Sequence, residues 1–382
     1  MIKGIKVKLY PTREQEILLW KSAGIARFAY NWAKRFSDTY YRIFRKTVSC
    51  GAMRKHFTKL RRRKKYAWLN EVSSEIPQQA IKDFDNARTR YFEHISKLPK
   101  FKTKKKSKVS FFHNNNKFVV EDGYIQLEKI GKIRMSDESR LPRGRYKKDK
   151  IKVTNPRIKH NGRYWYLSVG IECEETPLKL NPDLSVGIDL GIKELAIVSN
   201  FEKPFCNINK TKSVRKLKKR IRRLKRQASR KYEKNRRGQQ FIKTNNIRKL
   251  EQKIKILEQH LTNIRVNHTH QATNMIAKTK PSRIVMETLN VKGMLKNRHL
   301  ADAVQEQGFY RFIQYMKYKS EKYGIKFIQA DRFYPSSKTC SCCGNIKSDL
   351  KLSDRIYYCD NCGMILDRDK NASINLANYQ SA

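Results

Sequence analysis

Acidic residues are scarce in this chain relative to basic ones. The 382-residue sequence holds 34 Asp and Glu against 86 Lys and Arg, which gives a formal net charge of +52. A chain with so few acids repels itself unless a polyanion neutralises it, and Lys and Arg contacts to phosphates supply most non-specific affinity for nucleic acid. The composition therefore favours a nucleic-acid-binding protein, with a merely basic protein of the ribosomal type as the alternative.

Long apolar runs are absent as well. No run of 18 apolar residues occurs, which excludes a transmembrane helix and a membrane partner. The stretch "MIKGIKVKLYPTREQ" alternates apolar residues with lysine and has no apolar h-region, so we expect no secretory signal. Of the eight cysteines, five lie between Cys340 and Cys362, which is typical of a metal site in a reducing compartment. We therefore expect a cytoplasmic protein.

The N-terminal third of the chain has the pattern of one strand followed by helices. Residues 5–9 alternate apolar side chains with lysine, which predicts a strand. Thr12 and Gln15 have the spacing of a capping box, and residues 17–32 carry helical periodicity. Residues 73–95 predict a second strong helix. We expect a helical region that begins at Thr12 and is followed by the basic linker "PKFKTKKKSK".

Residues 109–174 have the texture of a sheet. They are rich in β-branched and aromatic residues, and Asp122-Gly123 and Asn161-Gly162 are hairpin signals. We expect a small sheet or β-barrel. The strand at residues 5–9 could complete it, which would make the helical region an insertion.

The C-terminal half predicts a mixed α/β region. The stretch "LSVGIDLGIKELAIVSN" predicts a hairpin of two buried strands around Gly191. Farther on, residues 213–237 contain 14 Lys and Arg and one acid, Glu233, around a narrow apolar stripe, and residues 247–264 repeat that stripe. We expect a helical hairpin with one apolar seam. Although charge runs are usually solvated surfaces, this density favours a nucleic-acid contact.

Three carboxylates stand in similar local settings. Asp189 interrupts an apolar strand before a turn, Glu287 does the same in "SRIVMETLNVKGM", and Asp369 begins a helical pattern in "ILDRDKNASINL". Half-buried carboxylates repel one another unless a cation lies between them, and Mg²⁺ prefers oxygen ligands. Two such ions can activate water and stabilise the leaving oxygen of a phosphodiester. Taken singly, each carboxylate could equally be a satisfied surface residue, and Asp369 a helix cap.

The cysteine cluster is a stronger signal. Two C-x-x-C knuckles, Cys340 to Cys343 and Cys359 to Cys362, are separated by 15 residues, which is zinc-ribbon spacing. Four thiolates close a tetrahedral shell, so this zinc would be structural rather than catalytic. Cys342 is a spare thiol that could replace Cys343, but the x-x spacing and the following glycine favour Cys343.

Four motifs in this order resemble those of the TnpB family, the transposon-encoded RNA-guided DNA endonucleases that are similar to compact type V CRISPR nucleases. They are "GIDLGIK", "VMETLNVKGM", "SSKTCSCCG…CDNCG" and "DRDKNASINL". With "GIKVKLYPTREQEILL" and "FKTKKKSKVSF", the resemblance spans nearly the whole chain. It implies that Asp189, Glu287 and Asp369 are the catalytic carboxylates. Asp367 is a near neighbour of the third, but the family's carboxylate stands two residues before the Asn of "NAS", here Asn371.

The resemblance also implies a fold class: multidomain mixed α/β, with an RNase H-like (RuvC) nuclease domain. A zinc ribbon is inserted in that domain, and a helical recognition domain is inserted in a β-barrel wedge domain. The boundaries we expect are 1–11 and 109–182 for the wedge domain, 12–108 for the recognition domain with its linker, 183–334 and 364–382 for the nuclease domain, and 335–363 for the ribbon, a target-nucleic-acid-binding domain.

The resemblance further implies two Mg²⁺ ions, one Zn²⁺, a guide RNA transcribed from the transposon end, and double-stranded target DNA read beside a short flanking motif. One protein chain per RNA and a nucleoid-associated location in a prokaryote are expected. In such recognition base pairing reads the sequence, and the protein holds the heteroduplex by charge and shape. Gln78 and Gln79 suit adenine edges, with ordinary helix surface as the alternative. The expected phosphate contacts are Lys104, Lys105, Arg222, Arg223 and Arg226.

Two other functions remain to be weighed. A transposase would use the same type of fold, but the usual order of its acids is Asp, Asp, Glu with the Glu on a helix, whereas Glu287 lies in a strand-like segment. A non-catalytic nucleic-acid-binding regulator would be favoured by the loss of any of the three carboxylates, and none is lost.

Overall fold

The computed structural model describes residues 2–104, 107–137, 141, 144–145, 153–172, 179–351 and 354–380. The chain divides into two compact units, Met1–Glu174 and Glu175–Ala382. Among the described residues, no helix is both long enough and apolar enough to span a membrane.

The first unit contains an eight-stranded antiparallel sheet. The strand order is β2-β7-β8-β1-β5-β4-β3-β6, so the first strand of the chain pairs with β8 and β5, as its alternating pattern suggested. Both predicted turns occur, between β3 and β4 and between β7 and β8. No described pairing joins β2 to β6, so closure into a barrel stays a prediction. The strands are β1 (Ile2–Tyr10), β2 (Val109–Phe112), β3 (Val119–Glu121), β4 (Tyr124–Leu127), β5 (Gly131–Met135), β6 (Gly144–Arg145), β7 (Val153–His160) and β8 (Trp165–Glu172).

The described helices of the first unit lie between β1 and β2 in the chain, except for η2 (Asn115–Lys117), which follows β2, and they share one hydrophobic cluster with the sheet. Thr12 caps the first helix through the predicted capping box with Gln15. The helix predicted over residues 73–95 ends at Phe92 instead, so Ile95 does not extend its buried face and is exposed. The helices are α1 (Arg13–Phe44), α2 (Cys50–Arg61), α3 (Glu75–Phe92) and the 3₁₀ helices η1 (Lys64–Glu71) and η2 (Asn115–Lys117).

The second unit is built on a four-stranded sheet in the order β10-β9-β13-β14. The predicted hairpin is present, because β9 (Asn181–Asp189) pairs antiparallel with β10 (Ile197–Val198). On the other side, β9, β13 (Pro281–Met286) and β14 (Lys326–Gln329) run parallel. Parallel neighbours need crossover connections, and helices supply both of them. The connecting helices are η3 (Ile208–Lys210), α4 (Lys212–Lys234), α5 (Asn245–Lys278), α6 (Val291–Met294), α7 (Ala301–Gln307) and α8 (Phe309–Tyr323).

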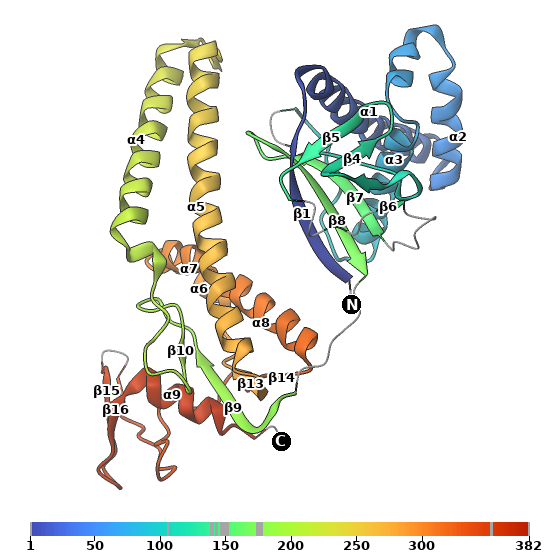
Figure 1. Ribbon diagram of the computed structural model, residues 1–382. Helices are drawn as coiled ribbons and strands as arrows, with labels where there is room; N and C mark the ends of the chain where they lie inside the picture. Colours follow the sequence, from blue (N-terminus) through green and yellow to red (C-terminus); the bar gives the residue numbers. More distant parts are fainter. Residues whose placement is uncertain are drawn as a thin grey trace. The chain divides into compact units, whose positions relative to one another are not determined.

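Helices cover both faces of this sheet (Figure 1). Alternate residues of the strands, such as Ile188 and Ile284, share a core with α5 and α8. On the opposite face, Val285 packs with Leu376 of the C-terminal helix α9 (Arg368–Ala377). A Cβ on Gly187 of β9 would lie 2.0 Å from the Ser373 carbonyl oxygen, so α9 packs directly on the strand backbone at this glycine. Only a glycine allows that approach.

Substitution of Gly187 by alanine is expected to destabilise the second unit and displace α9. The new methyl group would meet backbone atoms on α9, which cannot rotate away as a side-chain end could. Overpacking of this kind costs roughly 1–3 kcal/mol of unfolding free energy. Thermal melting measures the loss, and Gly4→Ala is the matched control, since nothing lies within 4 Å of a Cβ at that strand position. Equal melting temperatures for the two variants would contradict the packing argument.

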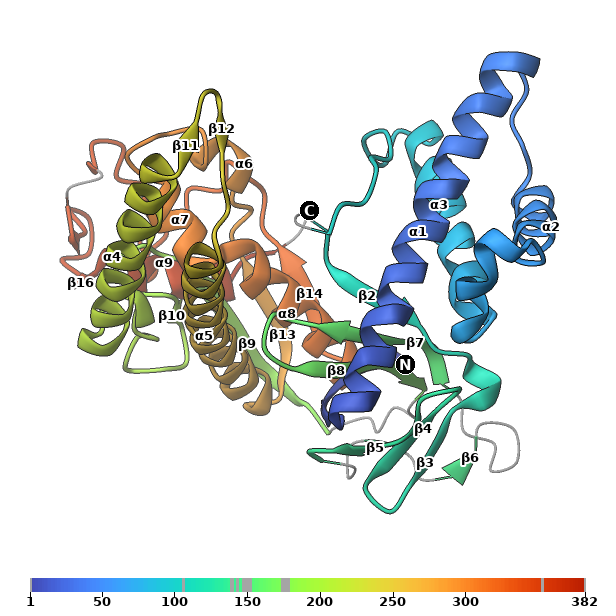
Figure 2. The same ribbon diagram turned by 90° about the horizontal axis from the view of Figure 1, so that it is seen from above.

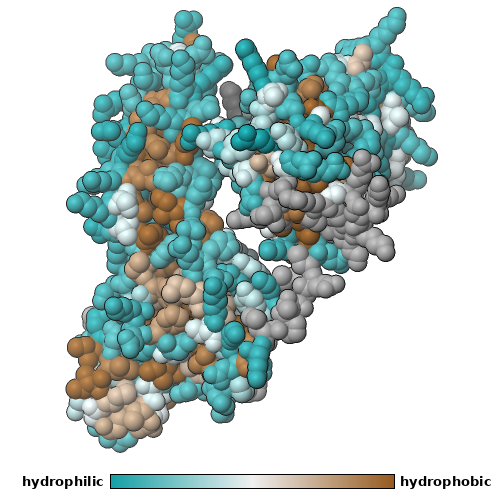
Figure 3. All heavy atoms as spheres, viewed as in Figure 1, coloured by the Kyte–Doolittle hydropathy of each residue, from teal (hydrophilic) through white to brown (hydrophobic). Residues whose placement is uncertain are grey.

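Helices α4 and α5 form a long antiparallel pair, which we call the arm. Leu224, Ala228 and Ile254 form its buried seam, together with partly buried Leu250 and Leu257, as the two apolar stripes predicted. Figure 3 shows this seam flanked by hydrophilic side chains. A short hairpin, β11 (Arg236–Arg237) and β12 (Gln240–Phe241), joins the helices at the tip of the arm (Figure 2).

The chain between β14 and α9 forms a small separate cluster, which we call the ribbon. It contains the antiparallel pair β15 (Ile356–Tyr358) and β16 (Ile365–Asp367). Its buried centre consists of Cys340, Tyr357 and Cys359.

Candidate active site and metal centre

Asp189 and Glu287 leave the sheet side by side. Asp189 is the last residue of β9, and Glu287 directly follows β13. The two strands are parallel, and Met286 pairs with Ile188 in their register. Asp189 follows Ile188 and Glu287 follows Met286, so the two carboxylates stand at neighbouring positions. The carboxyl ends of neighbouring parallel strands are the usual place for a ligand site in an α/β sheet.

Asp369 lies in the first turn of α9, whereas Asp367 precedes the helix and caps it. The Asp367 carboxylate accepts the backbone N–H groups of Asp369 and Lys370, both at 3.0 Å. Asp367 is thus the N-cap of α9, and its carboxylate satisfies two helix donors that would otherwise lack partners. The alternative that Asp369 is merely the helix cap does not hold.

The other two carboxylates affect Asp189 electrostatically. Burial raises the pKa of Asp189 to about 7, with further contributions from Glu287 and then Asp369. Burial also raises the pKa of Glu287. Two groups oppose the rise at Asp189, namely the Arg368 guanidinium and the backbone N–H of Leu190. Ionised carboxylates in such a setting are stabilised by a cation between them, and oxygen donors fit Mg²⁺.

Two arginines contact Asp369. The Arg368 Nε and Nη2 atoms lie 3.4 and 3.3 Å from its Oδ1, and Arg355 Nη1 lies 3.9 Å from its Oδ2. Arg355 precedes β15, so this contact comes from the ribbon. These guanidinium groups offset part of the negative charge of Asp369.

Four cysteines converge in the ribbon. Their Sγ atoms all lie within 4.8 Å of one another, the one such group of three or more His, Cys, Asp or Glu side chains in the part of the chain that is described. The Cys340–Cys362 and Cys343–Cys359 sulfur pairs are both 3.6 Å apart. A tetrahedron with Zn–S bonds of 2.3 Å has edges of about 3.8 Å. The four thiols could therefore bind a metal such as zinc, and the spare thiol, Cys342, is outside the group.

The local environment favours a thiolate at Cys343, one of the four thiols of this centre. The Asn361 side-chain amide donates to the Sγ of Cys343 at 3.5 Å. This hydrogen bond is the main cause that lowers the pKa of the Cys343 thiol to about 6. Metal-bound thiols are deprotonated, so the donor set suits zinc.

Two asparagines of α9 tie the ribbon to the helix that carries Asp369. Buried Asn371 donates its Nδ2 to the Thr339 carbonyl at 2.7 Å and accepts the Ser341 N–H at 2.9 Å. Asn375 donates to the carbonyls of Ser336 and Thr339 at 2.8 and 2.6 Å. Sequence reasoning did not assign this role. Two asparagines four residues apart in the short α9 segment are the signal that could have found it.

Two of the side chains that we expect to contact nucleic acid, Gln78 and Gln79, already form hydrogen bonds within the chain. The Gln78 Oε1 accepts a hydrogen bond from Arg54 Nε at 2.5 Å, and its Nε2 donates to Thr58 Oγ1 at 3.1 Å. The Gln79 Nε2 donates to Asp83 Oδ1 at 3.0 Å. Both amides would have to give up these partners to read bases, so their role stays a prediction.

The cationic contacts that we expect are more accessible. Lys104 is exposed, and Lys105 lies outside the described residues. Arg222, Arg223 and Arg226 are exposed on α4, and no ion pair involves them in the described ranges. These three guanidinium groups on the arm are therefore available for phosphates.

Three family models match parts of the chain. "Helix-turn-helix domain" matches residues 1–46, "Probable transposase" residues 168–298, and "Cas12f1-like, TNB domain" residues 309–376. The third match covers the ribbon and most of α9.

Similar proteins align over nearly the full length. A Streptomyces pristinaespiralis protein named "Putative RNA-guided DNA endonuclease" is 30% identical over 377 residues, 98% of this chain and 88% of that protein. An Escherichia coli K12 protein named "Putative RNA-guided DNA endonuclease InsQ" is 26% identical over 98% of this chain and 91% of that protein. A solved Cas12f1 chain, from a complex with sgRNA and target DNA, superposes with a TM-score of 0.55 at 13% identity and 99% coverage of both chains. That structure shares the mixed α/β multidomain fold.

Proposed function

Because the chain belongs to the TnpB-like family of RNA-guided DNA endonucleases, we propose that it cleaves double-stranded DNA at sites that a transposon-derived guide RNA selects by base pairing, next to a short flanking motif. The observation that carries this proposal is that Asp189 and Glu287 stand at the ends of neighbouring parallel strands, while Glu287 and Asp369 both raise the pKa of Asp189. Their order and setting support a RuvC-like phosphodiester hydrolase.

The carboxylates define what the chain contributes to the reaction. Asp189, Glu287 and Asp369 would hold two magnesium ions, which when bound activate a water and stabilise the leaving oxygen. The Asp367 cap fixes the first turn of α9 and therefore the backbone that carries Asp369. The three acids come from separate elements of the second unit: Asp189 ends β9, Glu287 follows β13 and Asp369 lies in α9.

The ribbon would hold one structural zinc through Cys340, Cys343, Cys359 and Cys362. A closed shell of four thiolates leaves no open position, so this metal would stabilise the ribbon and take no part in the chemistry. We assign residues 335–363, which make up most of the ribbon, to target-nucleic-acid binding. We assign residues 1–11 and 109–182 to a wedge domain, 12–108 to a recognition domain, and 183–334 with 364–382 to the nuclease.

The proposal is tested by the RNA that copurifies with the protein. We expect sequencing to recover one defined RNA that ends in a variable guide segment. The purified complex should then cut a DNA duplex that matches the guide, in the presence of Mg²⁺ and not of EDTA. The scrambled duplex is the control. Strand joining instead of cutting would indicate a transposase, and binding without cutting would indicate a regulator.

Charge reversal on the arm is expected to weaken nucleic-acid binding. Changing Arg222, Arg223 and Arg226 to Glu removes three exposed cations, so fewer counterions are released on binding. We expect an affinity loss of at least roughly tenfold and a salt slope that is smaller by up to about 3. Binding measured at two salt concentrations checks this. Leu224→Ala in the seam is the control that should lower stability instead, and an unchanged slope in the triple reversal would make the arm a solvated surface.

A further inference from the structure

The loop that follows Asp189 has no regular backbone pairing of its own until Leu195, and its carbonyl groups are satisfied by side chains. Asn207 donates its Nδ2 to the Ile192 carbonyl at 2.8 Å, and Lys210 donates its Nζ to the Lys193 carbonyl at 3.0 Å. Because the loop has no ladder of its own, these side-chain donors help to fix its conformation. The loop begins at Leu190, directly after Asp189 at the end of β9.

Gln307 is the central donor to this loop. It is the last residue of α7 and is buried. Its Nε2 atom lies 3.0 Å from the Gly191 carbonyl oxygen, and 3.4 and 3.3 Å from those of Ile192 and Glu194. One side-chain amide thus contacts three carbonyl groups of the six-residue loop from Leu190 to Leu195. Asn207 and Lys210 each donate to one carbonyl of the same loop.

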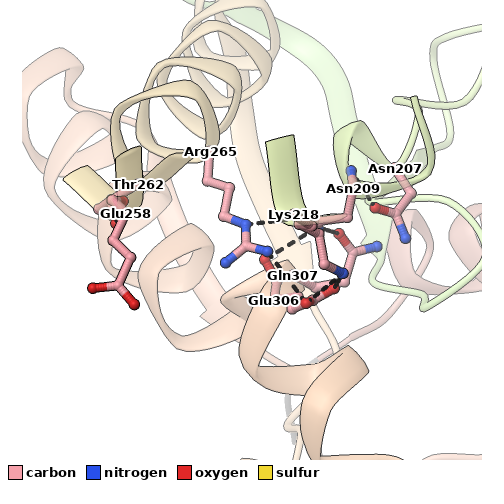
Figure 4. A network of polar contacts seen from close by, with 8 residues as sticks. All are labelled: Asn207, Asn209, Lys218, Glu258, Thr262, Arg265, Glu306 and Gln307. Carbon is pink, nitrogen blue, oxygen red and sulfur yellow. Dashed lines mark hydrogen bonds and ion pairs between the residues drawn. The ribbon is translucent and has the colours of Figure 1, made fainter. Parts of the chain in front are cut away.

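The residue before Gln307 connects the same helix end to the arm (Figure 4). The Glu306 carboxylate pairs with Lys218 of α4 at 2.6 Å and with Arg265 of α5 at 3.4 Å. Arg265 also donates its Nε to the Asn209 Oδ1 at 2.7 Å, and the Asn209 amide donates to the Glu306 carbonyl and to Gln307. Both helices of the arm therefore meet the end of α7 in one polar network.

We propose that Gln307 is a positioning residue for the catalytic Asp189, and that Glu306 couples the arm to the loop that orients Asp189. The inference rests on the proposed nuclease function. A phosphate backbone that binds the arm would displace α4 and α5, which contact Glu306 through Lys218 and Arg265. The adjacent Gln307 would transmit that displacement to the carbonyl groups of the loop. The polar groups in this path are Asn207, Asn209, Lys210, Lys218, Arg265, Glu306 and Gln307.

Gln307→Met tests the positioning role. Methionine keeps the length and volume of the side chain but removes the donor, so the three carbonyls lose their common partner. We expect Mn²⁺ binding to the metal-free protein, measured by calorimetry, and the single-turnover cleavage rate each to fall on the order of tenfold. Binding of the copurified RNA should stay unchanged.

Met316→Ala is the matched control for stability. Met316 is buried in the core beneath the same sheet and makes no hydrogen bond to the loop. If Gln307→Met and Met316→Ala show the same Mn²⁺ affinity and rate at equal losses of melting temperature, Gln307 only fills space and the positioning role is wrong. A wild-type protein that neither binds Mn²⁺ nor cuts DNA would instead contradict the proposed function.

Hydrogen exchange tests the coupling through Glu306. We expect the copurified RNA to slow exchange of the amides from Leu190 to Leu195 in the wild-type protein. Glu306→Gln should reduce that protection several-fold, because the carboxylate no longer binds both cations. Glu258→Gln is the control, since Glu258 pairs with Lys225 farther along the arm at 2.6 Å. Equal protection in both variants would refute the coupling and leave the positioning role to the first test.

Discussion

Alanine at Asp189, Glu287 or Asp369 is expected to abolish DNA cleavage and to leave guide RNA binding nearly intact. Each substitution removes an oxygen ligand from the proposed metal site and no phosphate contact. Loss of about 4 kcal/mol or more of transition-state stabilisation corresponds to a rate decrease of roughly 10³-fold. Single-turnover cleavage with a matched target, beside RNA binding by filter assay, separates the two effects.

Asp367→Ala is the matched control for the third carboxylate. Asp367 lies two residues from Asp369, but its side chain caps α9. Its loss is expected to cost about 1 kcal/mol of stability and to slow cleavage far less than Asp369→Ala. Normal cutting by Asp369→Ala together with an inactive Asp367→Ala would show that the third carboxylate is misassigned.

Asp189→Asn should be inactive yet more stable than the wild-type protein in EDTA. The carboxyl pKa is raised from 3.8 to about 7 in the folded protein, so the folded state binds this proton more tightly than the unfolded state does. This carboxyl therefore does not lower the free energy of unfolding below about pH 4, and it lowers that free energy progressively as the pH rises to about 7. An amide does not ionise. We expect the variant to melt a few degrees above the wild-type protein at pH 8 and equally at pH 4, and a lower melting temperature at pH 8 would contradict the electrostatic account.

Serine at Cys343 or Cys359 is expected to release the metal and unfold the ribbon. Metal analysis of the wild-type protein should give about one zinc per chain. Binding of structural zinc contributes directly to folding, so the loss should appear as a lower melting temperature and as faster hydrogen exchange between residues 335 and 363. Cys342→Ser is the control, because Cys342 is exposed and outside the group of four thiols. Metal release by Cys342→Ser with retention by Cys343→Ser would show that the knuckle is misassigned.

The same zinc variants should also slow cleavage, although the zinc takes no part in the chemistry. Asn371 binds the Ser341 N–H next to Cys340 and lies two residues after Asp369. Disorder in the ribbon therefore reaches the helix that carries a catalytic carboxylate. Full cleavage by a zinc-free protein would show that the asparagine contacts do not position Asp369.

The features that could be read from the sequence are those encoded by neighbouring residues. Two C-x-x-C knuckles predicted the four-thiol cluster, because each knuckle brings its own pair of sulfurs together. The two apolar runs around Gly191 predicted the β9–β10 hairpin, and the paired stripes predicted the seam of the arm. A helix or strand period depends on local backbone geometry, so these patterns hold whatever the rest of the chain does. The family resemblance rests on motifs of the same short range.

Only the tertiary structure decided what depends on contacts between distant segments. The parallel register of β9 and β13 joins residues about 100 positions apart and places Asp189 beside Glu287. The family motif favoured Asp369 over its neighbour Asp367, and only the structure shows that the Asp367 side chain caps α9. Close packing set the role of Gly187, and the end of α7 set that of Gln307. Such contacts arise from how whole elements pack, and no local period in the sequence records that packing.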